Sequence, residues 1–212
     1  MIIAIETATE VVGVALATPD GELLAHLEVR GSRRHAETLV PAIDFLCRQA
    51  QRRLDAVTAI AVDTGPGLFT GLRVGLATAK GLAYAHAVPI IAVASLEALA
   101  AAHARPGELV ASVIDARRGE LYAAHYRDGQ AIVEPWVGRP DAVAAQAAST
   151  AFVVGDGPLR HPANFVGLRT VHAHPSVAVV AALAAGRIGV EPGVAAVTYL
   201  RAPDAEINWV SR

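Results

Sequence analysis

Apolar residues follow two different spacings in the first part of the chain. Three short runs rich in apolar and β-branched residues, IIAIETA, VVGVALAT and ELLAHLEVR, predict three consecutive strands, with a Pro-Asp-Gly turn at Pro19 before the third. The first two runs are close enough to form a hairpin. From Thr38 to Arg53 the apolar residues recur at helical spacing, and Pro41 falls near the start of this helix, where proline is tolerated.

Strand and helix patterns alternate after that first helix. Residues 56–65, AVTAIAVDTG, form a continuous apolar run, which is typical of a strand buried on both faces in a sheet flanked by helices. A helix from about Phe69, the strand IIAVAS and a helix over 96–104 follow. The order is βββαβαβα, which predicts an α/β lobe over residues 1–104 with a mixed sheet packed on both sides.

A second group of elements follows the linker ARPGE at 104–108. Two strands surround the turn at Arg117-Arg118-Gly119, and IVEPWVG, a helix near 141–148, the strand AFVVGDG and a helix near 176–185 complete it. This group predicts a smaller and less regular C-terminal lobe over residues 105–194. The segment from about 195 to 212 is a candidate to pack back on the first lobe.

Composition narrows the classes of protein to consider. Of 212 residues, 53% are hydrophobic and 18% charged, which fits a soluble globular chain. The net charge is −2 with scattered basic residues, so we expect any tRNA contact to be indirect. The longest apolar run, 87–102, is too short and too polar to cross a bilayer, and the start of the chain lacks a secretion signal. With Cys47 as its single cysteine, the chain is predicted to be cytoplasmic.

The stretch GPGLFTGLRVGLATAKGLAYAHA, residues 65–87, begins like a phosphate-binding loop between a strand and a helix. A P-loop needs lysine after its last glycine, whereas Leu72 follows Gly71 here, and the glycine spacing does not match the dinucleotide fingerprint either. The anion-binding interpretation is therefore weak.

Residues with almost no side chain recur at every fourth position of this stretch: Gly67, Gly71, Gly75, Ala79, Ala83 and Ala87. Glycine inside a helix costs about 1 kcal/mol relative to alanine, so this glycine ridge predicts the close approach of another backbone. That backbone belongs either to the protein's own sheet or to a second subunit, and the spacing alone does not distinguish the two.

Four ordered motifs resemble one known family. IAIETAT, RRHAETLVPAID, VDTGPGLFTGLRVGLATAKGLA and VIDARRGELYAA, with TYLRAP at 198–203, are similar to the bacterial TsaB family. The resemblance implies a two-lobed fold like the actin-type ATPases (ASKHA) and sugar kinases. It also implies a role in making threonylcarbamoyladenosine in tRNA. Leu68 departs from the family pattern, which commonly has serine there.

The resemblance further implies a non-catalytic subunit that dimerises with TsaD, which carries the metal site, and that reaches the ATPase TsaE through this pair. In this family the partner contacts the first two helices of the N-terminal lobe. The candidate partner-binding residues are therefore Leu39, Ile43, Leu46, Gly67, Thr70, Gly71, Arg73, Gly75, Thr78, Ala79, Leu82 and Ala83. A homodimer through the same helices is an alternative.

Acidic residues at predicted strand ends are the remaining candidates for chemistry. A vestigial nucleotide site would consist of Glu6, Thr7, Asp63, Gly65, Gly67 and Asp115. The other interpretation is that these are strand-end polar groups or helix caps. Since no His-x-x-x-His pair is present, we expect no metal site. The resemblance implies that the chain requires no cofactor and that ATP or ADP binds at most at the interface with the partner.

The competing function is an autonomous enzyme of the same fold, namely an ATPase, a small-molecule kinase or a glycoprotease-like peptidase. None of the serines lies in Gly-x-Ser-x-Gly, and Cys47 has no neighbouring histidine in the sequence. A complete nucleophile or nucleotide site therefore cannot be assembled from the sequence.

Overall fold

Five strands form the first sheet of the computed structural model, which describes residues 1–31, 35–188, 196 and 200. The strands are β1 (Ile2–Glu6), β2 (Val11–Ala17), β3 (Leu23–Arg30), β4 (Ala59–Asp63) and β5 (Ile90–Val93), in the order β3-β2-β1-β4-β5. β1, β2 and β3 pair antiparallel, and β1, β4 and β5 pair parallel. The predicted hairpin and mixed sheet are confirmed.

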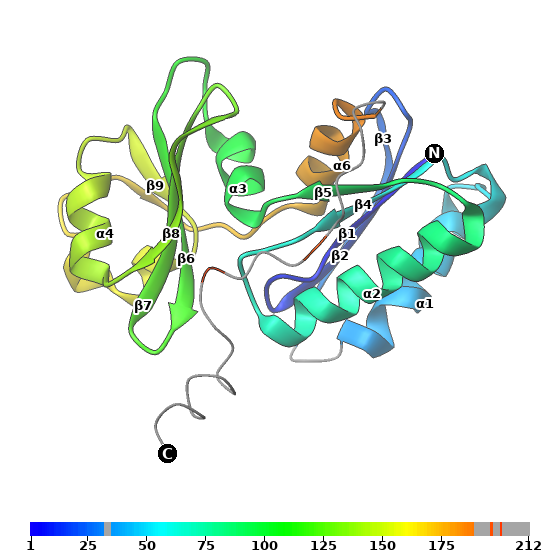
Figure 1. Ribbon diagram of the computed structural model, residues 1–212, viewed down its shortest axis with the longest axis horizontal. Coiled ribbons are helices and arrows are strands. Elements are labelled where there is room, and N and C mark those ends of the chain that lie inside the picture. The colour runs from blue at the N-terminus through cyan, green and yellow to red at the C-terminus, as the bar shows by residue number, and fades with distance from the viewer. Residues whose placement is uncertain (32–34, 189–195, 197–199, 201–212) are drawn as a thin grey trace.

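Helices cover both faces of this sheet (Figure 1). α1 (His35–Gln49) and α2 (Phe69–His86) lie on one face, and α6 (Val177–Ala185) lies on the other. Alternation along β1 explains the difference between the two layers, since Ile3 and Ile5 face α1 and α2 whereas Ile2 and Ala4 face α6. Much of the face under α6 consists of alanine, which lets that helix approach the sheet closely.

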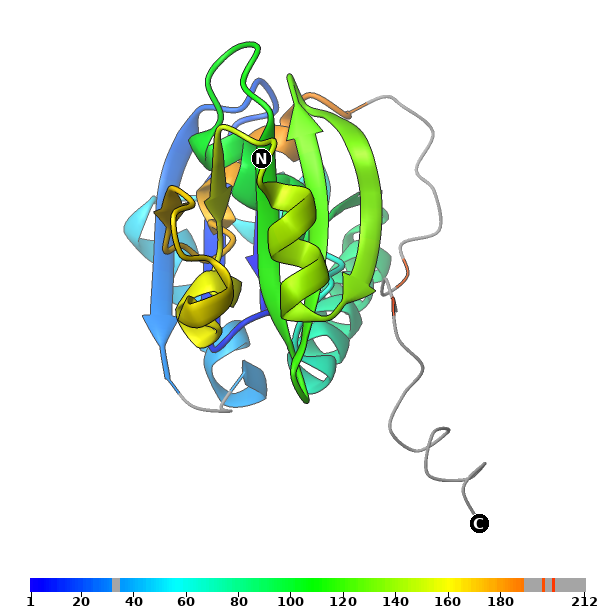
Figure 2. The ribbon, with the colours of Figure 1, turned by 90° about the vertical axis from the view of Figure 1, so that its left-hand side faces the viewer.

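The second sheet repeats the connectivity of the first. Its strands are β6 (Val110–Arg117), β7 (Glu120–Arg127), β8 (Gln130–Gly138), β9 (Phe152–Val154) and β10 (Thr170–Val171), in the order β10-β9-β6-β7-β8. In both sheets the first strand of the lobe is central, with the second and third strands on one side and the fourth and fifth on the other. α4 (Pro140–Ala147) covers the outer face of the second sheet (Figure 2).

Some short elements were not predicted. They are β10, α5 (Gly157–Arg160) and the 3₁₀ turns Leu54–Ala56 and Pro162–Asn164, and each is too short to show a period in the sequence. α1 begins at His35, three residues before the predicted Thr38, and Glu37 lies in its first turn, where an acidic side chain is favourable. None of the described helices is both long and apolar enough to cross a membrane.

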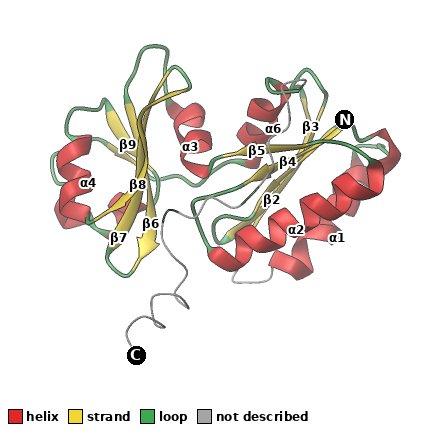
Figure 3. Ribbon diagram, in the orientation of Figure 1, coloured by secondary structure: helices red, strands yellow, loops and turns green. Residues whose placement is uncertain are grey.

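The division predicted between residues 104 and 105 separates the strands of the two sheets but not their helices. α3 (Ser95–His103), assigned to the first lobe, packs Leu96 and Leu99 against the second sheet. α6, assigned to the second lobe, packs Val177 and Val180 against the first sheet. The middle of the molecule is therefore a layer of two helices between the sheets (Figure 3). The segment 195–212 and the TYLRAP motif lie outside the described residues, except for residues 196 and 200.

Candidate functional site

The glycine ridge of α2 is an internal packing surface. A Cβ atom on Gly71 would lie 2.0 Å from the carbonyl oxygen of Thr7, and one on Gly67 would lie 2.2 Å from that of Ala8. A Cβ on Gly75 would lie 2.2 Å from Oγ1 of Thr7. The prediction that Gly71, Gly75, Ala79 and Ala83 contact a partner is wrong, because these four residues are buried against the end of β1 and the core beside it. Gly67 is half-buried and packs on Ala8, and its contact with a partner stays a prediction.

The three candidates on α1 face the same core. Leu39, Ile43 and Leu46 are buried between α1 and the first sheet, so their predicted role as partner contacts is also wrong. The reason is physical: helical spacing of apolar residues identifies the stripe that a helix buries, and here the protein's own sheet covers that stripe.

The outer surface of α1 and α2 carries a different set of apolar side chains. Tyr84 is 92% exposed, Val40 59%, Phe45 48% and Phe69 40%. Sequence reasoning missed these residues, although each is a large apolar residue off the buried stripe of its helix. The predicted Thr70 and Arg73 are exposed, whereas Thr78 is half-buried and Leu82 packs against the core. We use the name α1–α2 face for the exposed side chains on the outer sides of the two helices, Val40, Phe45, Phe69, Thr70, Arg73 and Tyr84. Arg73 lies over the ring of Phe69, 3.7 Å from its centroid.

Two carboxyl groups of the predicted nucleotide site meet inside the first lobe. Glu6 and Asp63 end the adjacent parallel strands β1 and β4, and both are fully buried. Oε1 of Glu6 accepts the backbone N–H of Ala8 at 2.7 Å. Oδ1 of Asp63 accepts the N–H of Gly65 at 2.8 Å and the hydroxyl of Ser95 at 2.6 Å. Within the described residues, Oε2 of Glu6 and Oδ2 of Asp63 have no hydrogen-bond partner.

Burial controls the protonation of this carboxyl pair. It raises the pKa of Glu6 well above its usual range, and the neighbouring carboxylate of Asp63 adds to the effect. Burial also raises the pKa of Asp63 to about 6, although the hydrogen bonds from Ser95 and Gly65 act in the opposite direction. The pair lies beneath the surface and stabilises the turns after β1 and β4 by accepting their backbone N–H groups.

The loops that would hold a phosphate are bonded to each other instead. The Leu68 N–H donates to the carbonyl oxygen of Ala8 at 2.7 Å, and the Thr7 hydroxyl donates to the carbonyl oxygen of Gly71 at 2.9 Å. Gly67 packs on the same Ala8 carbonyl. The turn after β1 and the loop before α2 are therefore closed on one another, with Thr7 buried and its hydroxyl already used.

Asp115 is not part of the buried pair. It lies near the end of β6 in the second lobe, where a carboxylate oxygen is 3.4 Å from Arg117 and its backbone N–H donates to Oδ1 of Asp156. β6 is the central strand of its sheet, as β1 is of the first, so Asp115 is the counterpart of Glu6 in the other lobe. A cleft between the lobes separates Asp115 from the turn that follows Glu6.

Other candidate ligands are dispersed. In the part of the chain that the structure describes, no group of three or more His, Cys, Asp or Glu residues is arranged to hold a metal ion. Cys47 is buried in the core beside α1, and burial raises the pKa of its thiol. His174 pairs with Glu28 at 3.1 Å, and Glu28 also accepts the first N–H of α6.

Comparison with known proteins decides the family. Residues 29–158 match the family described as "TsaD: tRNA N6-adenosine threonylcarbamoyltransferase". The chain is 38% identical to Escherichia coli tRNA threonylcarbamoyladenosine biosynthesis protein TsaB, over 59% of this chain and 54% of that protein. YeaZ from Pseudomonas aeruginosa, a solved structure, superimposes with a TM-score of 0.78 at 31% identity, over 93% of this chain and 99% of that one. The chain belongs to the TsaB (YeaZ) family.

Another relative matches nearly the whole chain. An uncharacterised protein of Mycobacterium tuberculosis is 34% identical over 97% of this chain and 93% of its own length. The chain spans about half the length of the TsaB proteins it matches, as in Escherichia coli and Bacillus subtilis. The ethanolamine utilization protein EutJ from Carboxydothermus hydrogenoformans shares the fold, with a TM-score of 0.51 at 11% identity. The predicted two-lobed actin-like ATPase fold is confirmed.

Proposed function

We propose that this chain is a scaffold subunit for threonylcarbamoyl transfer to adenosine 37 of ANN-decoding tRNAs. It dimerises with TsaD through the α1–α2 face and recruits TsaE through that pair, without catalysis of its own. It contacts tRNA only indirectly and requires no cofactor, and any ATP or ADP binds at the interface with TsaD. The proposal is supported by relatives whose names place them in threonylcarbamoyladenosine biosynthesis.

The observation that carries the proposal is the composition of the α1–α2 face. Val40, Phe45, Phe69 and Tyr84 present large apolar groups to solvent on two adjacent helices that the rest of the described chain leaves uncovered (Figure 1). Clustered exposed apolar side chains are typical of protein interfaces, and aromatic and arginine side chains dominate their binding energy. Arg73 over Phe69 adds such a pair at one end of the face.

The arrangement of the nucleotide-site candidates supports the non-catalytic part of the proposal. The Thr7 hydroxyl donates to Gly71 in α2, the Leu68 N–H of the loop before α2 donates to Ala8, and the Glu6–Asp63 pair is enclosed by the fold. An ATPase or kinase needs its phosphate-binding amides and acidic groups open to the ligand. The autonomous-enzyme alternative finds no support in this geometry.

The interface is tested by titrating the chain with TsaD from the same cell in a calorimeter. We expect Phe45→Ser and Tyr84→Ser each to weaken binding about tenfold or more, because each removes a large apolar contact. Ile132→Ser and Val166→Ser are matched controls, since both residues are exposed and apolar but belong to the second lobe, and we expect them to bind as the native chain does.

Equal affinity of folded Phe45→Ser and Tyr84→Ser variants would contradict the proposed face. If the chain forms a homodimer through these side chains and does not bind TsaD, the homodimer would replace the heterodimer as the proposed assembly. Circular dichroism of each variant shows that the fold is retained, as expected for exposed side chains.

A further inference from the structure

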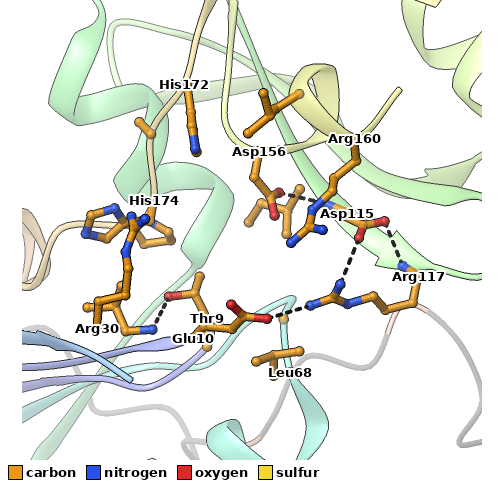
Figure 4. A pocket seen from close by; sticks show the side chains of 17 residues that line it. Thr9, Glu10, Arg30, Leu68, Asp115, Arg117, Asp156, Arg160, His172 and His174 are labelled. Carbon is orange, nitrogen blue, oxygen red and sulfur yellow. Dashed lines mark hydrogen bonds and ion pairs between the residues drawn. The ribbon is translucent and has the colours of Figure 1, made fainter. Parts of the chain in front are cut away.

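The cleft between the lobes holds a cavity of about 200 Å³ whose charged lining the proposed function does not use. The turn after β1, the end of β3, the loop before α2, the end of β6, α5 and the segment after β10 surround it (Figure 4). The charged side chains and histidines that line it are Glu10, Arg30, Asp115, Arg117, Asp156, Arg160, His172 and His174.

Most of these charges already have partners in the protein. Arg117 contacts Glu10 at 3.3 Å and Asp115 at 3.4 Å, so two of the three acids in the cavity share one guanidinium. Oδ1 of the third acid, Asp156, accepts a backbone N–H at 2.9 Å. His174 pairs with Glu28, outside the cavity lining, at 3.1 Å.

Two arginines and one histidine in the cavity lining differ from these paired charges. The side chains of Arg30, Arg160 and His172 make neither a hydrogen bond nor an ion pair with any other residue that the structure describes. Arg30 ends β3 in the first lobe, whereas Arg160 ends α5 in the second, and the two reach the cavity from opposite sides (Figure 4). His172 enters from the segment that follows β10.

We propose that this cleft binds a small organic phosphate, a phosphate monoester, between Arg30 of one lobe and Arg160 of the other. Guanidinium groups bind phosphate oxygens through paired N–H donors, and two of them on opposite walls fit the several terminal oxygens of a tetrahedral dianion better than one planar carboxylate. The Thr9 hydroxyl accepts the N–H of Val11, which leaves its own O–H to donate into the cleft.

The rest of the lining selects the remainder of the ligand. Ile114, Leu159 and Pro175 supply an apolar wall for an organic substituent. Pockets for drug-sized molecules run from about 300 to 1,000 Å³, so a cavity of about 200 Å³ suits a smaller molecule than a nucleoside triphosphate. The closure of the loop before α2 onto Ala8 also removes the backbone cradle that a polyphosphate chain would use.

The test is a calorimetric or NMR titration of the full chain with ribose 5-phosphate, with ribose, inorganic phosphate and ATP as comparison ligands. We expect millimolar or tighter binding of ribose 5-phosphate and none of ribose. The double variant Arg30→Gln/Arg160→Gln should weaken binding about tenfold or more. The control Arg52→Gln/Arg127→Gln removes the same net charge from exposed sites outside the cleft and should bind as the native chain does.

Three results would overturn the site: no binding of ribose 5-phosphate up to about 10 mM, equal affinity of the two double variants, or ATP binding more tightly than ribose 5-phosphate. Inorganic phosphate that binds as tightly as the ester would remove the role assigned to the apolar wall and overturn the ester assignment. Arg30 and Arg160 are not part of the α1–α2 face, so this result is independent of whether TsaD binds.

Discussion

Gly71→Ala is expected to destabilise the protein by about 3 kcal/mol, whereas Gly81→Ala on the same helix should stabilise it by about 0.5–1 kcal/mol. The new methyl group at Gly71 would lie 2.0 Å from the carbonyl oxygen of Thr7, a backbone atom of the turn directly after β1 that cannot rotate away. At Gly81 no atom lies within 4 Å, so the change only removes the entropic cost of glycine in a helix. The two variants make the same Gly→Ala change inside α2 and differ in the packing around the new methyl group.

Urea unfolding followed by circular dichroism measures both changes. Gly75→Ala gives an intermediate case, because its methyl group would meet the Thr7 hydroxyl, which can rotate only by losing its bond to the Gly71 carbonyl oxygen. A Gly71→Ala variant as stable as Gly81→Ala would show that α2 does not need glycine to reach β1.

Stability should fall as the pH rises from about 4 to about 6, and Asp63→Asn should remove much of this fall. The folded state raises the pKa of Asp63 from 3.8 to about 6, so the folded state binds a proton more tightly than the unfolded state does. The stabilisation from the neutral carboxyl group is fully present below pH 3.8 and is lost as the pH passes 6. A pKa change of this size corresponds to about 3 kcal/mol.

The measurement is the difference between the free energies of unfolding at pH 4 and pH 7.5 for the native chain and for Asp63→Asn. Asparagine keeps the oxygen that accepts from Gly65 and Ser95, so the variant changes the charge and little of the geometry. Asp44→Asn, at an exposed site on α1, is the control and should alter the difference by less than about 0.5 kcal/mol. Identical pH profiles for Asp63→Asn and the native chain would mean that Asp63 titrates as an exposed carboxyl group does.

Burial patterns explain why the strands of the first sheet were predictable. The residues of β1, β2 and β4 are buried on both faces, and such strands read as continuous apolar runs. The helices were found for the same reason, but a periodic stripe shows only that a helix has a buried side and not which surface covers it. That gap accounts for the exchanged positions of α3 and α6 and for the assignment of the glycine ridge to a partner.

The candidate sites were predictable to a similar extent. Glu6 and Asp63 come together because neighbouring parallel strands end at the same edge of a sheet. Asp115 follows the same rule in the second sheet, across the cleft between the lobes. Phe45 and Tyr84 were missed because the partner contacts were assigned to the periodic stripe of each helix, which is the side that the protein's own core buries.

The exchange of α3 and α6 has a consequence for how the molecule responds to stress. One apolar face of the first sheet is covered by α6, which follows the second sheet in the chain. One apolar face of the second sheet is covered by α3, which precedes that sheet in the chain. Separating the two lobes would remove a covering helix from both sheets at once. We therefore expect the chain to unfold in a single cooperative transition and not to yield independently folded fragments on proteolysis. Evolution could vary the outer helices α1, α2 and α4 separately, whereas the central pair constrains both halves together.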